Sequence, residues 1–201
     1  MEQFLSALPA TLIQGLIYAL ISLGVYITYS ILDFPDLGVD GTFPLGAAVT
    51  AVLLTKGVSP WLTLPIAMGV GALAGLFTGF IHVRLKVRDL LAGIITMTAL
   101  FSLNLQIAGS NLTIERATDT IFSSRAVVAL CGDMTLTGRK ILVSLVLVLA
   151  VKLGMDAYLR TKSGLLLRAV GDNASLVTTL AMDRGRMKIL GLAISNALVA
   201  L

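Results

Sequence analysis

The stretch Leu8–Leu32 reads LPATLIQGLIYALISLGVYITYSIL and carries no charged residue. About 20 apolar residues in an α-helix cross the ~30 Å hydrocarbon core of a bilayer. Backbone N–H and C=O groups find no water in that core, so a spanning segment has to satisfy them within its own helix. This stretch therefore predicts a transmembrane helix.

The composition extends this interpretation to the whole chain. Of its 201 residues, 57% are hydrophobic and 13% are charged, whereas soluble domains carry about 25% charged residues. So few charges cannot cover a globular surface exposed to water. The predicted fold class is all-α, a polytopic transmembrane helix bundle in a lipid bilayer, and the net charge of +4 is not a nucleic-acid signal.

Further apolar runs give the remaining spans. They are Val58–Ile81, Leu90–Ala108, Ile141–Leu159 and a last run, Ile189–Leu201. The last run has 13 residues, fewer than the ~20 needed to span. We therefore expect 1–201 to be one transmembrane domain, truncated at its C-terminus, with further spans in a longer protein.

The short apolar segment Gly41–Thr55 allows two interpretations. It is either a short span or a broken, re-entrant helix, because Pro35, Gly38 and Pro44 interrupt the backbone around its start. Broken backbone at membrane depth is tolerated only where protein or a water-filled cavity covers it. The side of the membrane on which the N-terminus lies depends on this choice.

Basic residues predict the orientation. The connections Arg84–Arg88 and Arg160–Lys188 hold nine of the fifteen Lys and Arg residues. Two predicted spans separate them, so they lie on the same side, and the positive-inside rule makes that side cytoplasmic. The connection Gly109–Arg139 then lies outside. Within the spans, Gly71, Gly75 and Gly79 form a small-residue ridge that predicts close helix packing.

The connection Arg160–Lys188 holds an amphipathic segment. Gly164–Val170 continues from the preceding span, and Asp172, Asn173 and Ser175 are candidate N-caps. A helical face of apolar side chains follows, at Leu176, Val177, Leu180 and Ala181. Gly185 between two arginines reads as its C-terminal signal. This helix of about ten residues either rests on lipid headgroups or docks on a soluble partner.

Polar side chains within the apolar regions are candidates for a translocation path. Asp33, Asp36 and Asp40 cluster beside the helix-breaking residues, where the alternative is a solvated turn. In the run Leu90–Ala108, polar residues either line a path or form interhelical hydrogen bonds. They are Thr96, Thr98, Ser102, Asn104 and Gln106. Lys152 and Asp156 are spaced as a surface ion pair, with a proton relay as the alternative.

Several functions are poorly supported. With one cysteine, Cys131, and one histidine, His82, the chain has no Cys- or His-pair metal motif. No G-x-x-x-x-G-K-[ST] pattern supplies an ATP site, and no cofactor or metal is expected. An intramembrane enzyme lacks a catalytic constellation, so the chain is not expected to be an enzyme. A structural or assembly membrane protein stays a competing interpretation.

Two segments resemble a known family. Residues 163–195, SGLLLRAVGDNASLVTTLAMDRGRMKILGLAIS, are similar to the cytoplasmic loop of ATP-binding cassette (ABC) importer permeases of the branched-chain amino acid type. Residues 14–49, QGLIYALISLGVYITYSILDFPDLGVDGTFPLGAAV, resemble that family's first helix and the break after it. At 33–37 the chain reads Asp-Phe-Pro-Asp-Leu instead of the family's Asn-Phe-Ala-x-Gly type, which resembles the tryptophan/tyrosine-type subgroup.

The resemblance implies an importer subunit in a bacterial cytoplasmic membrane. Its partners would be a cytoplasmic ABC ATPase, an external substrate-binding protein and a second permease subunit, in a homo- or heterodimer. The residues implied in ATPase coupling are Gly164, Arg168, Gly171, Asp172, Asn173, Leu176, Val177, Leu180 and Ala181. The candidates for the substrate pathway are Asp36, Asp40, Thr98, Ser102 and Asn104. The sequence does not name the substrate.

Overall fold

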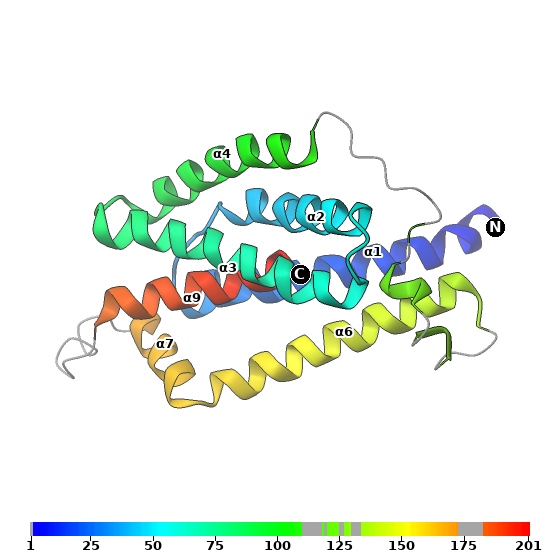
Figure 1. Ribbon diagram of the computed structural model, residues 1–201. Coiled ribbons are helices and arrows are strands. Elements are labelled where there is room, and N and C mark those ends of the chain that lie inside the picture. Colours follow the sequence, from blue (N-terminus) through cyan, green and yellow to red (C-terminus); the bar gives the residue numbers. More distant parts are fainter. Residues whose placement is uncertain (1, 110–117, 119, 125–126, 130–133, 173–182) are drawn as a thin grey trace.

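The computed structural model describes residues 2–109, 118, 120–124, 127–129, 134–172 and 183–201. Every regular element in these ranges is helical, which confirms the predicted all-α bundle (Figure 1). The elements are α1 (Glu2–Tyr26), the π-helical turn η1 (Ile27–Ile31), α2 (Val39–Thr55), α3 (Pro60–Arg84), α4 (Asp89–Ala108), the short 3₁₀ turn η2 (Ile121–Ser123), α6 (Leu136–Leu159), α7 (Lys162–Asp172) and α9 (Arg184–Val199).

Within the described residues, four helical segments are long and apolar enough to cross a membrane. They are Ala7–Ile31, Pro60–Arg84, Asp89–Ala108 and Leu136–Leu159. These match the predicted spans to within a few residues. The largest shift is at the start of α6, which begins at Leu136 because Thr135 caps it: Thr135 Oγ1 accepts a hydrogen bond from the Gly138 N–H at 3.3 Å.

The turn between α2 and α3 follows from its residues. Gly57 has a φ of +76°, a left-handed conformation that glycine adopts without steric cost after a helix C-terminus. Pro60 then opens α3 at a position whose missing N–H would have had no partner within the helix. The two helices consequently form an antiparallel pair (Figure 1).

Helix α9 lies at the centre of the bundle and contacts α1, α2, α3 and α7. Helix α9 packs on α3 at the predicted glycine ridge. A Cβ on Gly71 would overlap the Asn196 carbonyl oxygen, one on Gly75 would overlap the Leu192 carbonyl oxygen, and one on Gly79 would lie 2.9 Å from Ile189 Cα. Glycine therefore lets the two backbones approach closely, as small residues do between transmembrane helices.

The segment Gly41–Thr55 forms a short helix, α2, which begins after a break inside the bundle. Its buried residues include Gly41, Thr42 and Gly46, and it packs against α3, α4 and α9. Helix α2 runs back toward the end of the bundle at which α1 begins (Figure 1). The break that precedes α2 is thus covered by protein, as broken backbone at membrane depth requires, and whether α2 spans or re-enters stays a prediction.

The structure of the connection Arg160–Lys188 differs from the prediction in its helix boundaries. Gly164–Val170 does not continue the preceding span: the chain turns at Arg160–Thr161, and α7 is a separate helix that lies between the end of α6 and α9 (Figure 1). Asp172 lies in α7, and the helix that it is predicted to cap lies outside the described residues. Gly185 lies in the first turn of α9 and does not end a helix.

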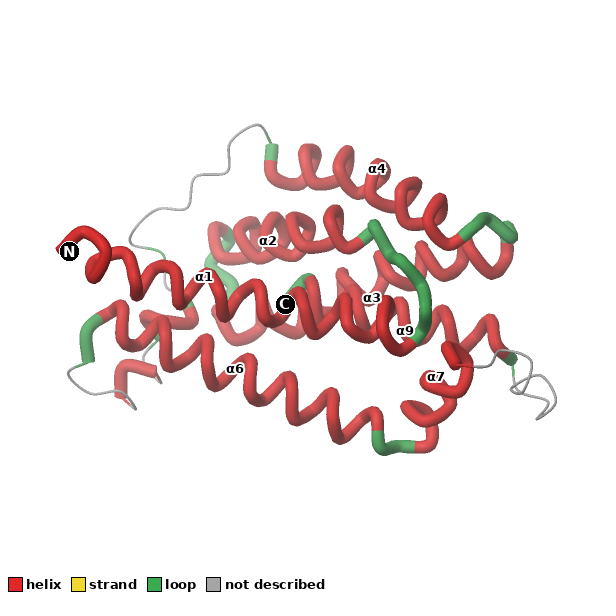
Figure 2. The backbone as a smooth tube through the Cα atoms, turned by 180° about the vertical axis from the view of Figure 1, so that it is seen from behind, coloured by secondary structure: helices red, strands yellow, loops and turns green. Residues whose placement is uncertain are grey.

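The two basic connections lie at the same end of the bundle, as predicted. Figure 2, which views the molecule from behind, shows the α3–α4 and α6–α7 connections and the start of α9 together at the end opposite the N-terminus. Lys152 and Asp156 near this end form the expected i,i+4 ion pair, with Nζ and Oδ2 2.7 Å apart and both side chains exposed. Which side of the membrane this end faces stays a prediction.

Candidate functional site

The helix break at residues 27–38 is the feature around which the candidate site is built. In η1 the Leu32 N–H donates to the Ile27 carbonyl at 3.0 Å, and the Phe34 N–H donates to the Thr28 carbonyl at 2.9 Å. These wide turns unwind α1 before Asp33, whose φ of +50° places it in the left-handed region. A π-type turn within a helix is rare and often marks a functional position.

Asp36 holds the break to two helices. Its Oδ1 accepts from the Gly38 N–H at 2.8 Å, next to the start of α2, and its Oδ2 accepts from Asn196 Nδ2 of α9, also at 2.8 Å. Thr42 Oγ1 lies 2.6 Å from Asn196 Oδ1. Asn196 is fully buried, so the Asp36–Asn196–Thr42 network is an interior polar contact between the break, α2 and α9.

The break also packs tightly against α3 and α4. A Cβ on Gly93 would lie 2.7 Å from the Leu37 N, so glycine is required where α4 passes the unwound chain. Beside it, Thr78 of α3 donates from Oγ1 to Thr96 Oγ1 of α4 at 2.9 Å. Thr96 thus forms an interhelical hydrogen bond, which was one of the two roles considered for the polar residues of this span.

The other polar residues of α4 separate into two sets. Asn104 Nδ2 donates to the Gly41 carbonyl of α2 at 3.0 Å, and Asn104 lines a groove between α2 and α4 together with Thr98 and Asp40. Ser102 and Gln106 are exposed on α4 outside this groove. The structure therefore brings together Asp40, Thr98 and Asn104 from the predicted substrate pathway, but places Asp36 in the Asn196 network and leaves Ser102 apart.

Of the residues implied in ATPase coupling, the two glycines on α7 pack toward the bundle. Gly164 is buried, and a Cβ there would overlap the Tyr158 carbonyl oxygen at the end of α6; a Cβ on Gly171 would overlap the Ile31 carbonyl oxygen of η1. Arg168 and Asp172 are exposed. Helix α7, which is part of the basic connection Arg160–Lys188, thus packs against both the end of α6 and the break. The remaining coupling candidates, Asn173, Leu176, Val177, Leu180 and Ala181, lie outside the described residues.

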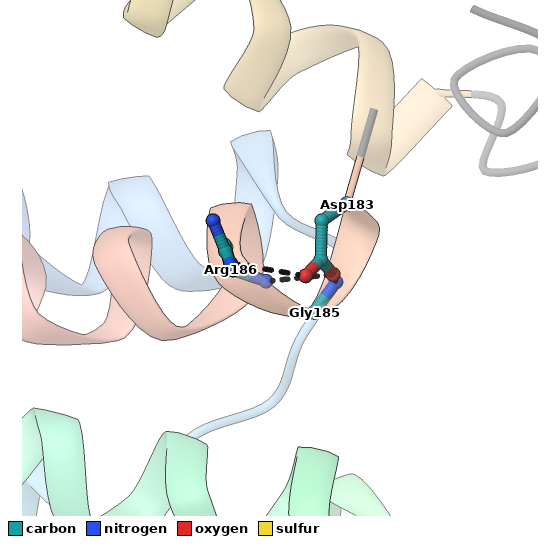
Figure 3. A network of polar contacts seen from close by, with 3 residues as sticks. All are labelled: Asp183, Gly185 and Arg186. Carbon is teal, nitrogen blue, oxygen red and sulfur yellow. Dashed lines mark hydrogen bonds and ion pairs between the residues drawn. The ribbon is translucent and has the colours of Figure 1, made fainter. Parts of the chain in front are cut away.

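Asp183 fixes the start of α9. Its Oδ1 accepts from the Gly185 N–H at 2.9 Å and the Arg186 N–H at 3.3 Å, and its Oδ2 lies 3.2 Å from Arg186 Nε (Figure 3). Sequence reasoning assigned no role to Asp183. An aspartate two residues before Gly185 is an N-cap signal that competes with the C-terminal signal assigned to that glycine.

A second contact missed from the sequence joins α9 to the break. His82 Nδ1 lies 2.9 Å from the Val87 carbonyl, so Nδ1 carries the proton it donates, and Nε2 accepts from Lys188 Nζ at 3.2 Å. Phe34 packs edge-on against the His82 ring, with centroids 5.0 Å apart, and Lys188 Nζ lies 5.9 Å from the Phe34 centroid. Phe34, which follows Asp33 in the break, is thereby held by His82 of α3 and Lys188 of α9.

These features describe a membrane-spanning helix bundle with a broken helix and polar groups in its interior, an arrangement typical of transport proteins. Residues 8–201 match the family model described as the permease component of branched-chain amino acid transport systems. The chain belongs to this family.

Curated relatives include a tyrosine transport system permease protein of Clostridioides difficile, 39% identical over 98% of this chain and 63% of the relative. An uncharacterized protein of Rickettsia prowazekii is 33% identical over 98% of this chain and 66% of that protein. A probable branched-chain amino acid transport permease protein of Methanocaldococcus jannaschii is 27% identical over 95% of this chain and 62% of that protein. The chain thus spans a little under two thirds of the length of these relatives. No solved structure matches it.

Proposed function

We propose that this chain is a transmembrane permease subunit of an ABC importer, which forms the translocation pathway for an amino acid or a related small solute. In this proposal an external binding protein delivers the solute, a second permease subunit completes the pathway, and a cytoplasmic ATPase supplies the energy. Membership in the permease family supports the role, and the names of two relatives, for tyrosine and for branched-chain amino acids, support the solute class. We place the complex in a bacterial cytoplasmic membrane.

The observation that carries the proposal is the direct contact between α7 and the helix break. Gly171 packs on the Ile31 carbonyl of η1, and the fully buried Leu167 of α7 belongs to the same apolar cluster as Leu32 and Phe34. A movement of the 160–188 segment therefore changes the packing of the unwound chain. Movement of this segment by a bound ATPase would therefore reach the polar groups of the break through direct packing contacts.

The 160–188 segment also has the charge expected of a cytoplasmic surface. Arg160, Lys162, Arg168, Arg184 and Arg186 are all exposed at this end of the bundle. Basic residues concentrate on the cytoplasmic side of membrane proteins. In the proposal, the predicted apolar face at Leu176 and Leu180 docks on the ATPase, and burial of a leucine side chain stabilises the complex by about 1.5–3 kcal/mol.

The experiment is co-purification of the ATPase with the full-length permease from membranes, at matched expression. We compare wild type, Leu180→Asp and the control Leu136→Asp, which makes the same change at an exposed position at the opposite end of the bundle. Leu180→Asp should lose the ATPase and its substrate-stimulated ATP hydrolysis, while Leu136→Asp should retain both. Equal recovery and equal ATP hydrolysis with Leu180→Asp would show that the segment is not the docking element.

A further inference from the structure

A groove of about 590 Å³ runs between α2 and α4. Every residue that lines it comes from these two helices, and most of its surface is apolar, including Pro44, Met97, Phe101 and Leu105. One ionisable side chain, Asp40, belongs to this lining. A carboxylate in an otherwise apolar wall needs a physical reason, because an unpaired charge is costly away from water.

Asp40 is exposed on the groove wall and lies level with the middle of α4. The next residue, Gly41, packs against Met97 and Leu100: a Cβ on Gly41 would lie 2.9 Å from Leu100 Cβ and 3.2 Å from Met97 Cα. With a rise of about 1.5 Å per residue, Leu100 is roughly 17 Å along the helix from Asp89, near the middle of this span. Ionisable groups at such depth mark substrate or ion pathways.

The carboxylate of Asp40 has no partner among the described residues. Neither ion pair of the described chain includes it, and the hydrogen bonds found there involve its backbone N–H but not its side chain. Asp36 is different, because both of its carboxylate oxygens already accept hydrogen bonds from Gly38 and Asn196. Of these two candidate carboxylates, Asp40 is therefore the one with capacity for a ligand.

Asn104 also lines the groove, and its oxygen is buried behind the groove surface. Its Nδ2 donates to the Gly41 carbonyl at 3.0 Å, and since a carbonyl only accepts, this contact fixes which end of the amide is oxygen. Asn104 Oδ1 is buried without a hydrogen-bond partner in the described part of the chain. The hydroxyl of Thr98 already donates to the Ile94 carbonyl at 2.9 Å. The polar part of the groove thus has unmet acceptors at Asp40 and Asn104, beside the second N–H of Asn104 Nδ2, which makes no hydrogen bond to the described residues.

We propose that this groove is a subsite for the ammonium group of a small solute with an apolar or aromatic body. The Asp40 carboxylate is the counter-ion of the ammonium group, and the walls formed by Met97, Phe101 and Pro44 hold the apolar body. The proposal rests on the proposed function and adds to it the group of the solute that the permease itself recognises. A solute with a carboxylate and no ammonium group would meet an unfavourable charge at Asp40.

An apolar occupant would leave these polar groups unexplained. A lipid acyl chain or another helix packed in the groove would bury the Asp40 carboxylate against hydrocarbon, at the cost of its hydration. An ammonium group supplies both the charge and the N–H donors that the Asp40 carboxylate lacks. Charge complementarity therefore favours a cationic solute group over either alternative.

The test measures saturable binding of radiolabelled L-phenylalanine to the full-length permease in nanodiscs, without the ATPase or the binding protein. Two analogues are used as competitors. Phenethylamine keeps the ammonium group and lacks the carboxylate, whereas 3-phenylpropanoate keeps the carboxylate and lacks the ammonium group. The variant is Asp40→Asn, which keeps size and removes charge. The control is Asp156→Asn, the same change at an exposed side chain of α6 that lies outside the groove.

We expect phenethylamine to compete and 3-phenylpropanoate to fail. Asp40→Asn should weaken phenylalanine binding at least tenfold, and Asp156→Asn should change it less than twofold. Absence of saturable binding to wild type, equal competition by both analogues, or unchanged binding by Asp40→Asn would each overturn the proposal. Loss of ATPase co-purification tests the importer role separately, because this binding measurement contains no ATPase.

Discussion

Gly171 of α7 lies against the carbonyl oxygen of Ile31, so closely that a Cβ at residue 171 would overlap that oxygen. Ile31 ends the π-helical turn that precedes the break. The contact joins α7, which is part of the basic connection Arg160–Lys188, to the point at which the first span unwinds. It is a backbone contact, so a side-chain rotamer change cannot relieve an added methyl group.

Gly171→Ala should therefore separate α7 from the break. Forcing an extra methyl group into a packed contact typically destabilises a protein by about 1–3 kcal/mol, and the helix-favouring effect of alanine offsets only about 0.5–1 kcal/mol of that. We expect a lower thermal unfolding midpoint for the purified permease. In the reconstituted transporter, we expect fewer solute molecules moved per ATP hydrolysed.

The matched control is Gly154→Ala on α6. A Cβ there meets nothing within 4 Å, so the substitution should leave the unfolding midpoint unchanged or raise it. If Gly171→Ala and Gly154→Ala unfold at the same temperature, the close approach of α7 to the break is not maintained in the membrane.

A second prediction concerns the packing of α9 on α3. A Cβ on Gly75 would overlap the backbone of Leu192, whereas a Cβ on Gly69 of the same helix meets nothing within 4 Å. Gly75→Ala should destabilise the bundle by about 1–3 kcal/mol, and Gly69→Ala should not. Thermal unfolding of the two purified variants in the same detergent measures the difference. A lower midpoint for Gly69→Ala than for Gly75→Ala would contradict this packing.

Hydropathy predicted the spans because length and lack of charge are properties of the local sequence. The glycine ridge predicted close packing, but it could not name the partner: Gly75 meets Leu192, and a small residue carries no information about which helix approaches it. The π-turn at Ile27–Ile31 was likewise beyond the sequence, since the ordinary apolar pattern of Leu8–Leu32 continues through it. The Pro and Gly residues after it predicted only that the helix breaks.

Helix boundaries in the basic connection were predicted incorrectly because the signals compete. Gly185 between two arginines resembles a helix end, yet the Asp183 carboxylate accepts from the N–H groups of Gly185 and Arg186 and starts α9. Asn196 was missed for a different reason. Its partner, Asp36, is 160 residues away in the chain, and a lone amide within an apolar run gives no sign of where its hydrogen bonds go.

The orientation of the bundle can be tested by labelling. With Cys131 replaced by serine, single cysteines are introduced by Lys56→Cys, Lys86→Cys and Lys162→Cys, at three exposed positions. Lys56 follows α2 at the end of the bundle where the N-terminus lies, and the other two lie at the basic end (Figure 1). A membrane-impermeant maleimide should label only Lys56→Cys in intact cells and all three after permeabilisation. Labelling of Lys86→Cys in intact cells would reverse the assigned topology.

The last prediction concerns the contact between Asp36 and Asn196. Removal of one partner leaves a buried acceptor or donor unsatisfied, which costs about 1–3 kcal/mol. Asn196→Ala should therefore lower the unfolding midpoint and impair transport, because Asp36 Oδ2 and the Thr42 hydroxyl both lose a partner. The control is Ser102→Ala, a polar truncation at an exposed position on α4, which should leave the midpoint nearly unchanged.

A double-mutant cycle separates this contact from general damage to α9. Residues in direct contact show interaction free energies of about 0.5–3 kcal/mol, so Asp36→Ala should cost less in the Asn196→Ala background than in wild type. The measurement is chemical or thermal unfolding of the four proteins in one detergent. Strictly additive free energies would mean that Asp36 and Asn196 do not stabilise each other and that another contact fixes the break to α9.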